Sequence, residues 1–187
     1  MGPIAGKLTA PFRRKAHVLC LDTGRPFMKK KIAVIAVITC LGLLLSGLAL
    51  ADEKSTDATA SGHMVAQAML TAHFIDAAVK AGMSADDINA VLAKVADETI
   101  ISEFWISDEA GRIVYTNRPG TEFVFPTDPE AGSQAAPFAA LLSGAETVVV
   151  QGVLPRELDG TAFKYVGVAG VDQARIVQVG VPGADLK

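Results

Sequence analysis

Cysteine is absent from most of this chain. Both cysteines, Cys20 and Cys40, lie near the N-terminus, and residues 52–187 contain none. In that part the absence excludes a disulfide scaffold, a cysteine nucleophile and a zinc site built on cysteines. Histidine is also scarce there, with only His63 and His73. Neither has a cysteine or a close acidic cluster beside it that would complete a set of metal ligands. We therefore expect no metal and no cofactor.

Motifs of catalysis are missing as well. No serine stands in a nucleophile elbow after a parallel strand, and no glycine-rich loop joins a strand to a helix to hold phosphate. The acidic pair Asp86-Asp87 comes at the start of a predicted helix, where negative charge stabilises the positive end of the helix dipole. We predict that the chain is not an enzyme.

Positive charge is scarce after residue 51. Residues 1–51 hold 8 basic residues and 1 acid, a net charge of +7, whereas residues 52–187 hold 9 basic and 19 acidic residues, a net charge of −10. An acidic body repels phosphate backbones, so we expect no nucleic-acid partner. Such an asymmetry within one chain is typical of a targeting segment.

The basic segment has the features of a secretory signal peptide. Three lysines, residues 29–31, precede an uncharged stretch, residues 32–51, that ends in Ala-Leu-Ala. This pattern predicts cleavage after Ala51 and release of the body into the periplasm. Met28 precedes the lysines, so we interpret residues 28–51 as the signal peptide and residues 1–27 as an extension upstream of the true start.

The alternative is an uncleaved inner-membrane anchor formed by residues 32–51. Twenty apolar residues are enough to span a bilayer. In either case the lysines stay inside, so the body lies outside the cytoplasm.

The body begins with a polar stretch and two predicted helices. Residues 52–61 are small and polar and predict a linker. Apolar residues then recur at steps of three and four over residues 64–81, which predicts a helix. Ser84 is expected to cap a second helix that ends near Glu98.

Five strands are predicted after the helices, over residues 100–107, 112–117, 147–154, 162–169 and 174–181. A loop and one short helix, residues 119–136 and 137–142, separate the second strand from the third. The predicted fold class is α+β, with N-terminal helices packed on a five-stranded antiparallel sheet, in one domain over residues 62–183.

Aromatic and polar side chains gather on the predicted strands. The candidates for a site are Trp105, Tyr115, Arg118, Arg156, Phe163 and Tyr165. Alternation places Phe163 and Tyr165 on one face of their strand, with Lys164 and Val166 on the other. A cleft lined by aromatic rings and one or two arginines could hold a small anion such as a carboxylate. The structural alternative is that the aromatics are core residues and the arginines are solvated.

Residues 101–117 (ISEFWISDEAGRIVYTN) resemble the first hairpin of PAS-like single Cache domains, the extracytoplasmic sensor modules of bacterial chemoreceptors and sensor kinases. Residues 163–172 (FKYVGVAGVD) and 175–180 (RIVQVG) resemble the last two strands of that family, and the resemblance covers about residues 62–183. It implies a ligand pocket between a curved sheet and its covering loops and helices, often for amino or organic acids. The pocket residues it implies here are Tyr115, Arg118, Arg156, Tyr165 and, with less support, Trp105.

Two functions follow from these patterns. The first is an exported sensor domain that binds a small molecule and passes the signal to a membrane receptor or kinase, since the chain ends at Lys187 before any cytoplasmic signalling domain. The second is a protein–protein interaction module without a small ligand, which could pair as a homodimer through the first helix. A cavity on the sheet would favour the first function, and a filled sheet face the second.

Overall fold

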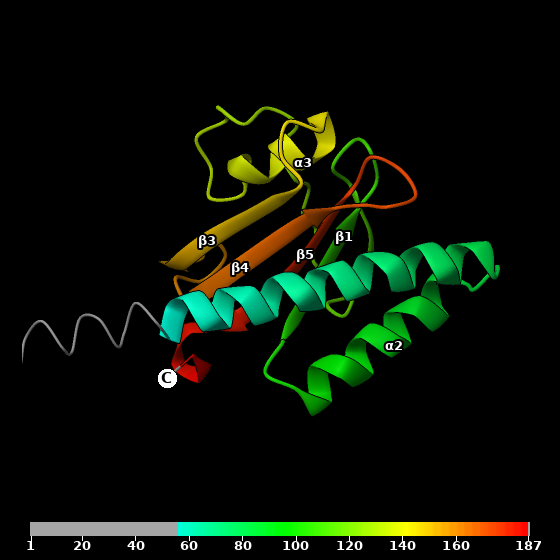
Figure 1. Ribbon diagram of the computed structural model, residues 1–187, viewed down its shortest axis with the longest axis horizontal. Coiled ribbons are helices and arrows are strands. Elements are labelled where there is room, and N and C mark those ends of the chain that lie inside the picture. Colours follow the sequence, from blue (N-terminus) through cyan, green and yellow to red (C-terminus); the bar gives the residue numbers. More distant parts are fainter. Residues whose placement is uncertain (1–55, 187) are drawn as a thin grey trace, which may run out of the picture. The chain divides into compact units, whose positions relative to one another are not determined.

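The computed structural model describes residues 56–186 (Figure 1). The predicted signal peptide, its predicted cleavage site and the predicted upstream extension lie outside these residues. Among the residues that are described, no helix is both long enough and apolar enough to cross a membrane. The described chain runs through two long helices, a hairpin, a segment with short helices, and three further strands.

The first helix already includes residue 56 and continues to residue 80. The predicted linker is therefore wrong for residues 56–61, which are helical. A tertiary contact accounts for the difference: the Nζ of Lys164, on a distant strand, lies 2.8 Å from the Asp57 carboxylate, and the Lys164 side chain is only 1% exposed. The helix propensity of residues 56–61 cannot reveal this contact, because Lys164 lies more than 100 residues away in the sequence.

Helix α2, Ala85–Glu98, confirms the second predicted helix. The Ser84 side chain accepts a hydrogen bond from the Asp87 amide at 3.1 Å, which satisfies one of the free N–H groups at the helix start. Ile88 and Leu92 bury the apolar side of the helix.

The sheet has five strands in the order β2-β1-β5-β4-β3, and every neighbouring pair is antiparallel. The strands are β1 Glu103–Ser107, β2 Ile113–Thr116, β3 Val148–Pro155, β4 Ala162–Ala169 and β5 Ile176–Pro182. All five predicted strands are present, and the α+β class is confirmed. The last strand, β5, lies at the centre because it pairs with both β1 and β4.

The two faces of the sheet have different covers. One face packs against the first helix and α2 through apolar side chains that include Ala72, Ile75, Ile88, Val166 and Val179. The other face carries an aromatic cluster that includes Trp105, Phe163 and Tyr165. Since side chains alternate along each strand, the same strands serve both faces.

The segment between β2 and β3 covers the second face. It contains the 3-10 helix η1, Ala136–Phe138, and the short helix α3, Ala139–Ser143, which lie over one end of the sheet (Figure 1). Phe138 packs over Gly167 of β4, where a Cβ would lie only 2.6 Å from the Phe138 ring. The glycine therefore lets the cover approach the sheet closely.

A ligand-sized cavity under the sheet cover

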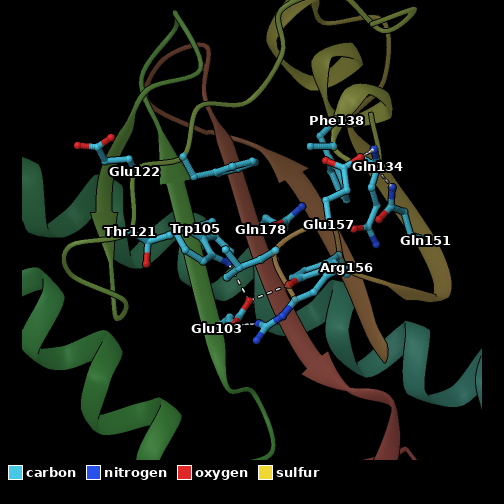
Figure 2. A pocket seen from close by; sticks show the side chains of 14 residues that line it. Glu103, Trp105, Thr121, Glu122, Gln134, Phe138, Gln151, Arg156, Glu157 and Gln178 are labelled. Atoms are coloured by element: carbon cyan, nitrogen blue, oxygen red, sulfur yellow. Dashed lines mark hydrogen bonds and ion pairs between the residues drawn. The ribbon is translucent and has the colours of Figure 1, made fainter. Parts of the chain in front are cut away.

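A cavity of about 280 Å³ lies between the sheet and the segment that covers its second face. The sheet contributes Glu103 and Trp105 from β1, Tyr165 from β4 and Gln178 from β5. The cover contributes aromatic rings and the Gln134 side chain, β3 contributes Gln151, and the β3–β4 turn contributes Arg156 and its neighbours. Figure 2 shows these side chains converging on the cavity from several elements.

Glu103 is the central polar group of the cavity. Its side chain is 3% exposed, and both carboxylate oxygens have partners. Oε2 accepts hydrogen bonds from Trp105 Nε1 at 3.1 Å and from the Tyr165 hydroxyl at 2.8 Å. Oε1 pairs with the Arg156 guanidinium and lies 3.6 Å from Nη2 of Arg118. A buried carboxylate stays compatible with the fold when its oxygens are satisfied in this way.

Arg156 is held between two carboxylates. Besides pairing with Glu103, it donates from Nε and Nη2 to the two oxygens of Asp159, at 2.7 and 2.6 Å. The guanidinium carbon lies 4.3 Å from the centroid of the Phe163 ring, which adds a cation–π contact. The side chain is 15% exposed, so this arginine is largely enclosed by its partners.

These contacts shift the pKa of three groups. Burial, and then the charge of Glu103, raise the pKa of the Tyr165 hydroxyl well above its ordinary value of 10.0. The hydrogen bonds to Asp159 raise the pKa of Arg156, and the Arg156 guanidinium lowers the pKa of Asp159 below the usual carboxyl range. Tyr165 therefore stays protonated and donates to Glu103, while Arg156 and Asp159 stay charged.

Aromatic rings form the apolar side of the cavity. Trp105 meets Phe123 edge-to-face with ring centroids 5.7 Å apart, and Phe123 meets Phe125 in the same way at 4.9 Å. Phe125 in turn contacts Phe138 at 6.1 Å. This chain of rings links β1 to the short helices of the cover and forms an apolar wall.

Two glutamines of the cavity lining, Gln134 and Gln151, each have one buried polar atom that is unpaired. The Gln151 side chain donates to the backbone carbonyl of Gln134 at 2.6 Å, and the backbone N–H of Gln134 donates to Glu157 at 2.7 Å. Gln134 Nε2 and Gln151 Oε1, however, are buried atoms without a hydrogen-bond partner. An unpaired buried donor and acceptor are costly, so a molecule that pairs with both would gain binding free energy.

No protein-family model matches this chain, and no curated protein matches it. The resemblance to Cache domains therefore stays a prediction. Among residues 56–186, no three histidine, cysteine, aspartate or glutamate side chains are grouped so that they could hold a metal ion.

The structure brings together most of the side chains singled out from the sequence. Trp105, Arg156 and Tyr165 line the cavity. Phe163 stacks on Tyr165 with ring centroids 5.5 Å apart, just behind the lining. Arg118 is 47% exposed and reaches the site only through Glu103.

Tyr115 is placed elsewhere. On β2 it pairs with Ile106, and it packs in the cluster under the helices, on the opposite face of the sheet. The Arg175 guanidinium lies 5.9 Å from its ring centroid. The strand alternation that faces Trp105 toward the cavity turns Ile106, and with it Tyr115, toward the helices. The prediction that Tyr115 belongs to the pocket is therefore wrong.

Sequence reasoning missed Glu103, although a signal for it exists. Glu103 is the one charged residue of β1 and stands two residues before Trp105, on the same face. A charged residue among apolar neighbours needs a partner when it is buried. The glutamines carried no comparable signal, because Gln134 lies in the cover segment and meets Gln151 only in the folded chain.

Proposed function

We propose that this chain is an exported sensor-type domain that binds a small molecule in the cavity and passes the signal to a membrane receptor or kinase. The cavity between sheet and cover is the observation that carries the proposal. Ligand sites are typically concave, mostly apolar and equipped with a few converging polar groups, and this one combines an aromatic wall with unpaired amides. Its place on the sheet also fits the resemblance to Cache domains.

The two-sided sheet provides a physical route for the signal. Strands β1, β4 and β5 each place some side chains in the cavity cluster and others against the helices. A ligand that shifts Trp105 or Tyr165 therefore acts on strands that also support the first helix. This helix lies nearest in sequence to the predicted export segment, so a membrane partner could meet the domain there.

The test is a thermal-shift screen with metabolites on protein purified after expression of the full chain. Ala135→Leu places extra volume at a position that lines the cavity, whereas Ala131→Leu adds it at an exposed position of the same segment. We expect a ligand at 100 times its Kd to stabilise the wild type by about 2.7 kcal/mol. Ala131→Leu should respond equally, and Ala135→Leu much less.

A second function is favoured by exposed apolar side chains. On the first helix Met69 and Leu70 are 50% and 66% exposed, and the edge strand β3 carries exposed Val150 and Val153 with no charged residue. Exposed apolar patches and uncharged edge strands mark sites of association. A protein that forms a stable dimer and that no metabolite stabilises would support the interaction module and count against the sensor.

A further inference from the structure

We infer that the cavity is built for a small ammonium compound that also carries an amide or carbonyl group, and not for a carboxylate. This inference rests on the proposed function, since it names the ligand class of the same cavity. The ligand class differs from the carboxylate that the arginines in the sequence predict, because the structure pairs those arginines with the protein's own carboxylates.

Arg156 has little capacity left for an acidic ligand. Among the described residues it is the one cation that lines the cavity, and Asp159 and Glu103 already neutralise it through three N–H groups. A carboxylate ligand would have to displace one of these carboxylates or lie beside the buried charge of Glu103. Like charges at such distances repel each other strongly where water is excluded.

The remaining charges of the lining are negative. Glu122 and Glu157 line the cavity and are exposed. Arg156 is paired with Glu103 and Asp159, and the described part of the lining has no other basic residue to balance these two acids. One oxygen of Glu157 accepts a hydrogen bond from the backbone N–H of Gln134 at 2.7 Å, which holds this carboxylate next to Gln134. The local field therefore attracts a cation and repels an anion.

The aromatic wall and the amides complete the recognition. An ammonium group gains from a ring face within about 6 Å, and the cavity lining contains the rings of Trp105 and Phe123. Figure 2 shows Gln134 and Gln151 close to Glu157 and away from the Glu103–Arg156 pair. These two amide atoms are buried within the wall, so the glutamine side chains must turn toward the cavity before a ligand amide accepts from Gln134 Nε2 and donates to Gln151 Oε1, with its ammonium group near Glu157.

The decisive comparison uses two probes of similar size, L-alaninamide and L-lactate, with protein from the full chain at mildly acidic pH, where the amine is protonated. We expect L-alaninamide to raise the melting temperature and L-lactate to leave it unchanged. Glu157→Gln keeps an acceptor for the backbone N–H of Gln134 but removes the charge, and should weaken L-alaninamide binding about threefold to fivefold. Glu109→Gln, on the β1–β2 turn, is the matched control and should bind as the wild type does.

The outcomes separate the two proposals. Stabilisation by L-lactate but not by L-alaninamide would overturn the ligand class and leave the sensor function standing. The same holds if only other metabolites of the screen bind. Equal binding of L-alaninamide to wild type and Glu157→Gln would overturn the role given to the acids. If no compound of any class stabilises the protein, both the ligand class and the sensor function fail.

Discussion

Glu103 joins three elements of the cavity through one carboxylate. Its partners come from β1 itself, from β4 and from the β3–β4 turn, namely Trp105, Tyr165 and Arg156. Charged hydrogen bonds of this kind are stronger than neutral ones, and they fix direction as well as distance. The positions of the Trp105 and Tyr165 rings are thus tied to the Glu103 carboxylate.

Tyr165 offers the clearest measurement, because the chain has only two tyrosines. In Tyr115→Phe, Tyr165 is the sole phenol, and we expect its phenolate absorbance to appear only well above the ordinary pKa of 10.0. Burial and the Glu103 carboxylate both oppose ionisation. A midpoint near 10.0 with the fold intact would refute the description of Tyr165 as a buried donor.

The same shift sets a pH dependence of stability. The pKa of Tyr165 is higher in the folded chain than in the unfolded one, so its contribution to the free energy of unfolding is fully present below pH 10.0. It is lost as the pH rises from there toward the folded pKa. Urea unfolding of Tyr115→Phe should therefore show a steeper alkaline loss of stability than Tyr165→Phe, which lacks the group.

At the scale of elements, close approach of side chains to the sheet depends on glycines. A Cβ at Gly180 of β5 would lie 2.5 Å from the Tyr165 ring and 3.3 Å from the Glu103 Cβ, whereas a Cβ at Gly152 of β3 would meet nothing within 4 Å. We expect Gly180→Ala to lower the free energy of unfolding by about 1–3 kcal/mol through overpacking. Gly152→Ala, the matched control, should be neutral or stabilising by less than about 1 kcal/mol.

Urea denaturation of both glycine variants checks this expectation. Equal stabilities of Gly180→Ala and Gly152→Ala would mean that the Tyr165 ring can move away from β5 without loss. The hydrogen bond to Glu103 would then not hold the Tyr165 ring in one position in the cavity.

How well each element can be predicted depends on how far apart in the sequence its interacting residues lie. Helix α2 and its Ser84 cap depend on neighbours in sequence, and the strands depend on alternation, so both could be predicted. The first turns of the N-terminal helix, residues 56–61, could not be, because Asp57 is held by Lys164. Similarly, alternation put Phe163 and Tyr165 on one face of their strand, as the structure has them, but the partner of each arginine depends on which strands become neighbours.

For the whole molecule, the uneven charge predicts processing. Expression of the full chain in a Gram-negative bacterium should yield a periplasmic protein whose N-terminus is Asp52, because the Ala-Leu-Ala sequence before it suits the signal peptidase. Cleavage removes a segment of charge +7, keeps every residue that the structure describes, and leaves a body of charge −10. Isoelectric focusing should accordingly find a pI below the 5.6 of the full sequence.

A cleavage-site variant separates the two arrangements considered for the export segment. Ala51→Leu puts a large residue at the cleavage site and should leave the chain in the inner membrane, with its acidic body still outside the cytoplasm. N-terminal sequencing and cell fractionation of wild type and variant provide the measurement. If the wild type also fractionates with the membrane and keeps an N-terminus before residue 32, the segment is an anchor. The first helix would then connect the cavity-bearing sheet to the membrane directly, and the signal would need no diffusing carrier.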